Sequence, residues 1–287
     1  KEEADLQKIF DEQLSKCKID YFDIYLLHSL GAYNYEVAEK YHSFEFIQKM
    51  KAEGKIKHLG FSFHDNAEKL DEILTKHPEI EYVQLQINYI DWESDNVQSR
   101  KCYEVAMKHN KQVIIMEPIK GGSLANLMDD AKKIYTDYAP KASLASWAIR
   151  YAASFENVYV VLSGMSNLDQ LRDNISYMKD FIPLNDDERK CIDKATEVIK
   201  NTIAIPCTAC KYCTEGCPAK INIPRYFEIF NEAKRYGVDS FKWHFNEEKK
   251  KGGSPSDCVE CGQCEDQCPQ HLKIIDLLKE VDSTMNG

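Results

Sequence analysis

The first 200 residues alternate short apolar runs with longer stretches in which apolar residues recur at helical spacing. Five of the runs are rich in β-branched and aromatic residues, and we predict strands at 21–27, 56–61, 82–87, 112–116 and 158–162. Short, nearly continuous apolar runs are typical of strands that are buried on both faces of a parallel sheet.

The stretches between these runs predict helices at 66–76, 99–110, 168–179 and 186–200. Asp65 and Asn66 are candidate N-caps for the first of them. Asn185 precedes the last one and Glu188 follows three residues later, which is the arrangement of a capping box. Because strands and helices alternate, the pattern predicts βα units and a parallel sheet.

The rest of the chain predicts a small α-helical domain. Helices are expected at 225–236 (directly after Pro224), 239–246 and 274–281. We place the domain boundary between 200 and 201, so that the domains are 1–200 and 201–287. The charged segment 247–251 precedes two glycines and predicts a solvated loop. Three aromatic residues of this domain are interpreted as packing around the clusters rather than binding substrate, namely Tyr226, Phe241 and Trp243.

Charge and hydropathy narrow the class of protein. The chain has 37 basic and 47 acidic residues and a net charge of −10, which argues against nucleic acid as a partner because nucleic acid selects a basic face. No run of 18 apolar residues is present, so we expect no membrane span, and we find no secretory signal segment. These features predict a cytoplasmic protein.

Eight of the eleven cysteines form two copies of the pattern C-x2-C-x2-C-x3-C-P. Bacterial ferredoxins bind [4Fe–4S] clusters with this spacing, and the last cysteine of each run ligates the other cluster. One cluster is therefore assigned to Cys207, Cys210, Cys213 and Cys268. The second cluster is assigned to Cys258, Cys261, Cys264 and Cys217.

Other roles for cysteine fit this pattern less well. A zinc site calls for paired C-x2-C motifs or mixtures of Cys and His, and disulfides are rare in intracellular proteins. Three cysteines lie outside the two runs, and we interpret Cys17, Cys102 and Cys191 as small buried apolar groups.

Five segments of the first part resemble, in order, the fourth to eighth strands of the aldo-keto reductase family. They are D-I-Y-L-L-H at 23–28, G-K-I-K-H-L-G-F-S at 54–62, V-Q-L-Q-I-N-Y at 83–89, V-I-I-M-E-P-I at 113–119, and S-G-M-S-N with the helix start that follows it at 163–174. The fused cysteine domain resembles that of a subgroup of this family with an iron–sulfur module. The resemblance implies an α/β fold, a partial (β/α)8 TIM barrel, joined to a helical dicluster ferredoxin-like domain.

The resemblance also implies roles for particular residues. His28 corresponds to the family's catalytic histidine, which orients the substrate carbonyl, and His58 and His64 have no catalytic role. Ser62 and Gln84 correspond to residues that hold the nicotinamide carboxamide of NADP(H). Further cofactor contacts are implied at Met116, Gly164, Ser166, Gln170 and Asn174.

The chain also departs from the family pattern. A closed barrel needs eight strands, and the family's aspartate, tyrosine and lysine have no counterpart in the five units present. Lys1 lies within a stretch that we predict to be helical, so we interpret the chain as part of a longer protein that is inactive by itself. Phe63 replaces an asparagine, and Met116 replaces an aromatic residue that stacks on the nicotinamide. A flavin therefore remains an alternative to NADP(H).

Together these observations predict an iron–sulfur oxidoreductase that acts on a small carbonyl-type molecule and passes electrons through two [4Fe–4S] clusters. A ferredoxin, a flavodoxin or a flavoprotein is the expected redox partner. The alternative hypothesis is a non-catalytic electron-transfer subunit or redox sensor that keeps only the cofactor site. A reductase whose clusters are structural is a third hypothesis.

Overall fold

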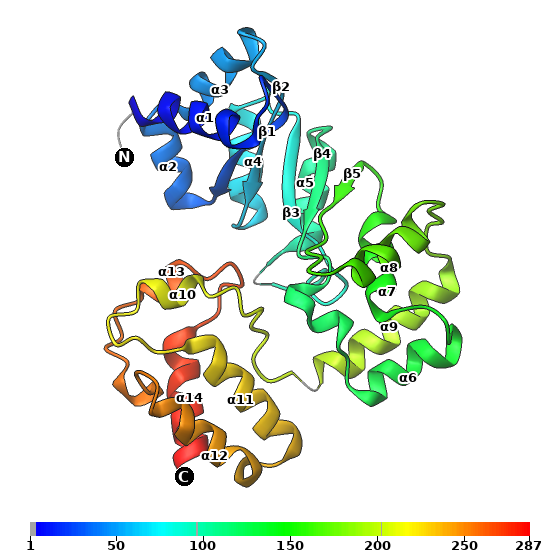
Figure 1. Cartoon of the computed structure of the whole chain (residues 1–287), viewed down its shortest axis with the longest axis vertical. Helices are drawn as coiled ribbons and strands as arrows, with labels where there is room; N and C mark the ends of the chain where they lie inside the picture. Colours follow the sequence, from blue (N-terminus) through cyan, green and yellow to red (C-terminus); the bar gives the residue numbers. More distant parts are fainter. Residues whose placement is uncertain (1–3, 96, 202) are drawn as a thin grey trace. The chain divides into compact units, whose positions relative to one another are not determined.

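The computed structural model describes residues 4–95, 97–201 and 203–287 (Figure 1). Lys1, for which we predict helix, lies outside these residues. The chain divides into two compact units. The first unit comprises Lys1–Pro118 and Ile149–Pro183, and the second comprises Ile119–Ala148 and Leu184–Gly287. This spatial division differs from the boundary that we place in the sequence, because segments before residue 200 belong to the second unit; the domain assignment stays a prediction.

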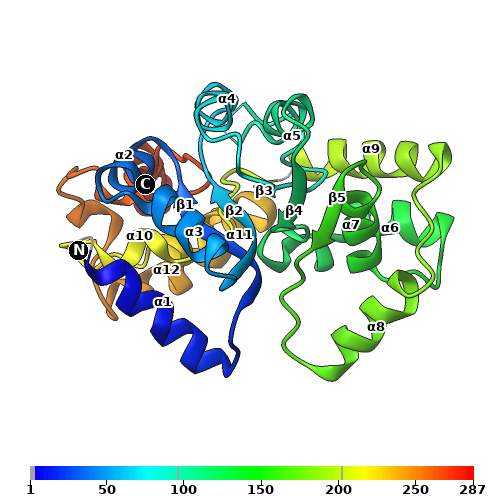
Figure 2. The ribbon, with the colours of Figure 1, turned by 90° about the horizontal axis from the view of Figure 1, so that it is seen from above.

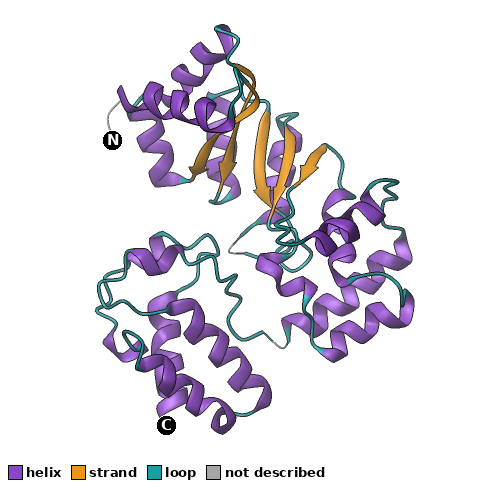
Figure 3. Ribbon diagram, viewed as in Figure 1, coloured by secondary structure: helices purple, strands orange, loops and turns teal. Residues whose placement is uncertain are grey.

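The first unit is built on a parallel sheet of five strands in the order β1-β2-β3-β4-β5 (Figure 3). The strands are β1 (Phe22–Leu30), β2 (Ile56–Phe63), β3 (Tyr82–Gln86), β4 (Gln112–Met116) and β5 (Val158–Val161). Each strand pairs with its neighbour along the chain, as consecutive βα units of a barrel do. The predicted parallel sheet and partial barrel are therefore confirmed.

The ends of β1 and β2 differ from the prediction. Both strands continue past their predicted ends, because the parallel ladder extends to the pair Leu30 and Phe63. His28 and Ser62 consequently lie inside strands, close to their carboxyl ends.

The first unit also contains helices that lie wholly within it. They are α1 (Ala4–Cys17), α2 (Ala32–Lys40), α3 (Ser43–Ala52), α4 (Ala67–Lys76), α5 (Ser99–Lys108) and α8 (Leu168–Met178). Figure 2 shows α4 and α5 side by side along the sheet. The side chain of Asn66 accepts a hydrogen bond from the Lys69 N–H at 2.9 Å and so caps α4 as predicted. Buried residues of α4 pack against the strands, each contributing about 1.5–3 kcal/mol; they are Leu70, Ile73 and Leu74.

The second unit is helical. Its elements are η1 (Lys120–Ala125), α6 (Asp129–Tyr138), α9 (Asp186–Lys200), α10 (Tyr212–Glu215), α11 (Ile223–Tyr236), α12 (Val238–Lys249), η2 (Pro255–Asp257), α13 (Gln263–Asp266) and α14 (Ile274–Asn286). Helix α7 (Leu144–Ala153) contains the point where the chain passes from the second unit to the first. The predicted capping box of α9 is confirmed, because Asn185 accepts from the Glu188 N–H and Glu188 accepts from the Asn185 N–H.

An aromatic core holds α11, α12 and α14 together. Tyr226 and Phe230 of α11 and Phe245 of α12 are fully buried in it. Phe241 packs at the edge of this core, as predicted for a packing residue. The interpretation of Trp243 was wrong, because its side chain is 65% exposed. Residues two apart point to nearly opposite sides of a helix, so the burial of Phe245 turns Trp243 outward.

Two further predictions for loops and cysteines need correction. The segment 247–251 is not a solvated loop: α12 runs to Lys249, and Glu248 is buried. Its carboxylate accepts hydrogen bonds from Asn222 Nδ2 at 2.7 Å and Lys251 Nζ at 3.0 Å. Cys102 and Cys191 are buried as predicted, whereas Cys17 is exposed. In the part of the chain that the structure describes, no helix is both long and apolar enough to cross a bilayer.

Candidate functional site

In the first unit, the predicted site residues lie near the carboxyl ends of neighbouring strands. The Cα of Ser62 on β2 is paired with that of Gln84 on β3. Met116 ends β4 and is paired with Gln86. His28 lies on β1 and its side chain is exposed. Because parallel strands end at one edge of the sheet, β1 to β4 bring these residues to the edge where barrels place their active sites.

A β-bulge shapes the site at β1. The register between β1 and β2 shifts between Leu27 and Leu30, and Ser29 has φ 55°, in the left-handed region that few non-glycine residues adopt. The Ser29 N–H donates to Ser62 Oγ at 2.7 Å, which fixes the bulge against β2. Bulges commonly redirect a neighbouring side chain, and here the residue beside the bulge is His28.

Gln84 and Met116 are in direct contact. Gln84 Nε2 donates to Met116 Sδ at 3.3 Å, and only 9% of Met116 is exposed. A thioether is a weak acceptor, so a ligand oxygen that reached this amide would form the stronger bond.

The loop after β5 is held by side chains of α8. Gln170 Oε1 accepts from both the N–H and the hydroxyl of Ser166, at 2.7 and 3.1 Å. Asn174 Nδ2 donates to Ser163 Oγ at 2.8 Å. Gly164 and Ser166 are exposed, and a side-chain carbon at Gly164 would meet nothing within 4 Å. Gln170 and Asn174, predicted as cofactor contacts, thus brace an open loop at the N-terminus of an eleven-residue helix.

A buried polar network beyond β3 was not predicted from the sequence. Asp91 Oδ2 accepts from Gln86 Nε2 and Asn88 Nδ2, both at 2.8 Å, and Asn88 also donates to the Glu117 carbonyl at 3.1 Å. All three side chains of the network are at least 95% buried. The network joins the chain after β3 to the chain after β4. The sequence feature that could have revealed this network is a run of amide and carboxylate residues at the end of a buried strand and directly after it.

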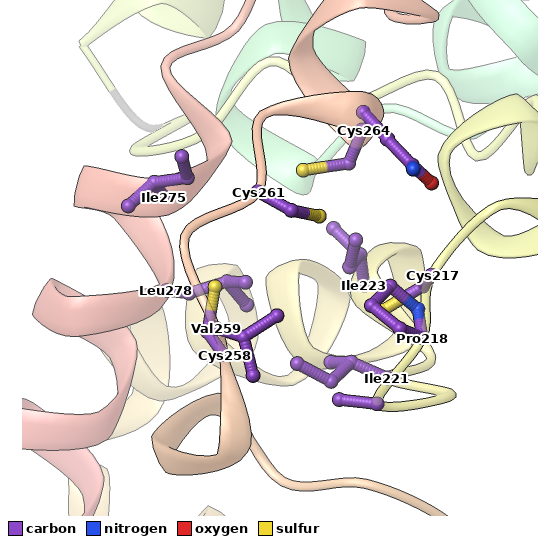
Figure 4. Close-up of a pocket in the computed structure, with 12 residues that line it drawn as sticks. Cys217, Pro218, Ile221, Ile223, Cys258, Val259, Cys261, Cys264, Ile275 and Leu278 are labelled. Carbon is purple, nitrogen blue, oxygen red and sulfur yellow. The ribbon is translucent and has the colours of Figure 1, made fainter.

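The second unit contains two pockets, each with four cysteines in its wall. The first pocket is lined by Cys207, Cys210, Cys213 and Cys268. The second pocket is lined by Cys217, Cys258, Cys261 and Cys264 (Figure 4). These are the two sets that the sequence assigns to two clusters. The empty space in the pockets, open solvent included, is about 310 and about 330 Å³, so the two could hold groups of the same size.

The two cysteine runs share one backbone geometry. Ala209 and Glu260, each preceding the second cysteine of its run, have φ of 55° and 56°. Lys211 and Gly262, each following that cysteine, have φ of 69° and 79°. Alternation of right- and left-handed residues turns successive N–H groups inward and forms the concavities that bind anions, including iron–sulfur clusters. The Ala209 N–H already donates to Cys207 Sγ at 3.4 Å.

Burial favours the protonated thiol at three of the pocket cysteines in the absence of metal. It raises the pKa of Cys207 and Cys264 to about 11 and that of Cys213 to about 12. Metal binding to these sulfurs must therefore release protons.

The pocket walls fit a [4Fe–4S] cluster. In the second pocket the remaining wall is apolar apart from Gln263, and Figure 4 shows sulfurs from the Cys217 segment and the 258–264 segment around one space. In the first pocket, Thr208 Oγ1 is buried and has no hydrogen-bond partner among the described residues. A sulfide or thiolate of a cluster would accept that hydrogen bond. Nowhere in the described ranges do three His, Cys, Asp or Glu side chains come close enough to hold a single metal ion.

Comparison with known proteins agrees with both halves of this description. Residues 1–197, more than half of the chain, match the profile described as the Aldo/keto reductase family. The chain belongs to the aldo/keto reductase family. Residues 206–272 of this aldo/keto reductase match the 4Fe-4S dicluster domain, so the C-terminal part is a dicluster ferredoxin domain.

Solved structures similar to this aldo/keto reductase share its fold. An aldo-keto reductase from Bacillus halodurans in its holo form is 22% identical with a TM-score of 0.53, covering 68% of this chain and 65% of that one. An aldo/keto reductase from Klebsiella pneumoniae in complex with NADP and acetate is 19% identical with a TM-score of 0.53, covering 66% and 64%. An aldo/keto reductase from Brucella melitensis is 21% identical with a TM-score of 0.52, covering 68% of both chains. This chain thus spans about two thirds of the lengths of these proteins. A search of curated proteins found no match.

Proposed function

We propose that this aldo/keto reductase is an iron–sulfur oxidoreductase that couples a nicotinamide site on its sheet to electron transfer through two [4Fe–4S] clusters. The observation that carries the proposal is the presence of two complete sets of four cysteines, each around its own pocket. A single structural metal would need only one such set.

NADP(H) is the proposed cofactor of the first unit. Ser62 and Gln84, paired across β2 and β3, would hold the carboxamide, and Met116 would lie against the ring. The phosphates would bind at the exposed loop of Gly164 and Ser166 that precedes α8, where the dipole of this helix favours negative charge. The bound nicotinamide supplies hydride chemistry. The related structure from Klebsiella pneumoniae contains NADP, and this favours NADP(H) over a flavin.

His28 is the proposed catalytic residue of this chain. Its exposed ring beside the bulge would donate a hydrogen bond to the carbonyl oxygen of a small substrate and hold it in position. In the family a tyrosine protonates that oxygen, and no residue of this sequence is assigned that role. We therefore propose that the chain as given does not complete the reduction by itself.

The number of electrons released by one NADPH equals the number that two clusters can take up. Oxidation of NADPH to NADP+ and a proton releases two electrons, whereas each [4Fe–4S] cluster takes up one. The two pockets could thus store the electrons of one hydride and pass them singly to a ferredoxin, flavodoxin or flavoprotein. The cytoplasmic location stays a prediction from the sequence.

The test is anaerobic NADPH oxidation with a one-electron acceptor such as ferricyanide. The protein with both clusters should sustain it, and the double variant Cys213→Ser with Cys264→Ser should lose it while still binding NADPH. Cys191→Ser is the matched control, because this cysteine is buried outside both pockets. Equal rates in the double variant and the wild type would overturn the proposed coupling.

A non-catalytic electron-transfer subunit or redox sensor is the second candidate. It is favoured by Phe63 and Met116, which replace residues that the family uses to hold the nicotinamide. This candidate predicts clusters that dithionite reduces and NADPH does not, and no turnover of any carbonyl compound.

A further inference from the structure

Lys120 is buried against the first pocket. Only 3% of it is exposed, and its Nζ donates a hydrogen bond to Gln270 Oε1 at 3.0 Å. Gln270 is itself buried, lines the first pocket and comes two residues after Cys268. A lysine ammonium is thus held in the same low-dielectric region as one complete set of four cysteines.

The backbone around Lys120 fixes this position. Lys120 and Gly121 both have left-handed φ, 46° and 64°. A side-chain carbon at Gly121 would lie 2.4 Å from the Thr208 carbonyl oxygen, so only glycine fits there. Thr208 directly follows Cys207, and the segment therefore packs tightly on the first cysteine run.

The charge of Lys120 reaches the cysteines of this pocket. The Lys120 ammonium bonds to Gln270, which lines the pocket together with the four cysteines. Because both side chains are buried, water screens this charge poorly, and the charge stabilises negative charge placed in the pocket.

The residues that the structure describes give the second pocket no equivalent buried lysine. Among the described residues of the second unit, Lys120 is the lysine with less than a tenth of its surface exposed. Lys279 approaches Cys258, but its side chain is 56% exposed and paired with Glu260 at 2.9 Å. Such an exposed pair is well screened by water. Glu265 next to Cys264 adds negative charge on that side.

We propose that Lys120, held in place by Gln270, raises the reduction potential of the cluster in the first pocket above that of the cluster in the second pocket. Reduction adds one negative charge to a cluster, and a nearby buried cation stabilises the reduced form. The first electron to enter the protein then resides in the first pocket. This inference rests on the proposed binding of two clusters.

The test is an anaerobic redox titration of the holoprotein, followed by electron paramagnetic resonance of the reduced clusters. The wild type should show two separate midpoints. Lys120→Met removes the charge at similar length and should change the ratio of oxidised to reduced cluster about tenfold, lowering one midpoint by ~59 mV and leaving the other in place. The midpoint that moves should also be the one altered by Cys210→Ser.

Controls separate charge from structure. Lys120→Arg keeps the charge and should keep the wild-type midpoint, whereas Lys279→Met removes a solvated charge near the second pocket and should shift neither midpoint appreciably. If the Lys120→Met variant binds clusters poorly, Gln270→Glu is the second test. It places a carboxylate beside Lys120 and should lower the same midpoint.

Unchanged midpoints in Lys120→Met, or equal shifts in both, would overturn the inference while leaving the proposed function intact. A wild-type protein without either cluster signal would overturn the proposed function as well.

Discussion

The Ser29 N–H donates a hydrogen bond to Ser62 Oγ at 2.7 Å, and this contact joins the bulge of β1 to the end of β2. It gives the Ser62 hydroxyl a structural role beside its proposed contact with the carboxamide. Replacement of Ser62 by alanine should leave the Ser29 N–H without its acceptor and lower the free energy of unfolding by about 1–3 kcal/mol.

Urea unfolding monitored by circular dichroism measures this change. Ser176→Ala is the control, because its exposed hydroxyl bonds only locally, to the Asp173 carbonyl on the same helix. Equal stabilities of Ser62→Ala and Ser176→Ala would show that the bulge does not depend on the Ser62 hydroxyl.

Removal of the Gln84 amide should weaken NADPH binding. One hydrogen bond contributes about 0.5–1.5 kcal/mol, so the dissociation constant of Gln84→Ala should rise about two- to twelvefold. Fluorescence titration with NADPH measures it. Gln112→Ala, at the opposite end of the strands, should bind like the wild type; a similar loss in both variants would contradict a specific contact at Gln84.

The Thr208 hydroxyl should stabilise the protein only when a cluster is bound. In the apoprotein it is a buried group without a partner, so Thr208→Val should leave stability unchanged or raise it by about 1–3 kcal/mol. In the holoprotein the same change should remove a hydrogen bond to the cluster and lower stability. Thermal unfolding of both forms gives the comparison, with Thr214→Val as control, since its exposed hydroxyl donates to the Lys211 carbonyl. If Thr208→Val changed the stability of both forms equally, no cluster atom would lie within hydrogen-bonding distance of Thr208.

Glu248 should make the second unit sensitive to acid. Burial acts to raise its pKa, but hydrogen bonds from Lys251 and Asn222 outweigh this and hold the pKa below its ordinary value. A group with a lowered pKa in the folded state contributes stability that is present above the unfolded pKa of about 4.3 and is lost as pH falls through the folded pKa.

Glu248→Gln should therefore flatten the dependence of stability on pH below about 4.3. Urea unfolding across that range measures the slope. Glu247→Gln, on the same helix and paired with Lys250, is the matched control. A slope for Glu248→Gln that equals the wild-type slope would refute this role.

Patterns carried by the local sequence predicted much of this structure. The five strands, the capping box at Asn185 and the two sets of cysteines could be read directly, because each depends on periodicity or spacing within one segment. Features that depend on partners far away in the sequence could not be predicted in this way. Trp243 and Phe245 are both aromatic, and only the packing of α12 on α11 decides which is buried. Glu248 sits in a charged run, yet Asn222, 26 residues earlier, makes its burial favourable.

Lys120 shows the same limit at the candidate site. Its partner Gln270 lies 150 residues away, and no periodicity connects the two. The bulge at Ser29 could not be predicted either, because the acceptor of the Ser29 N–H, Ser62, belongs to the next strand.

We propose that nicotinamide bound to the sheet of this aldo/keto reductase feeds electrons to the iron–sulfur domain. Anaerobic titration of the complete, flavin-free protein with NADPH, followed by the visible absorbance of the clusters, measures this transfer. NADPH should bleach the clusters, and about one equivalent should reduce both because one hydride carries two electrons. Bleaching by dithionite but not by NADPH would contradict this proposal.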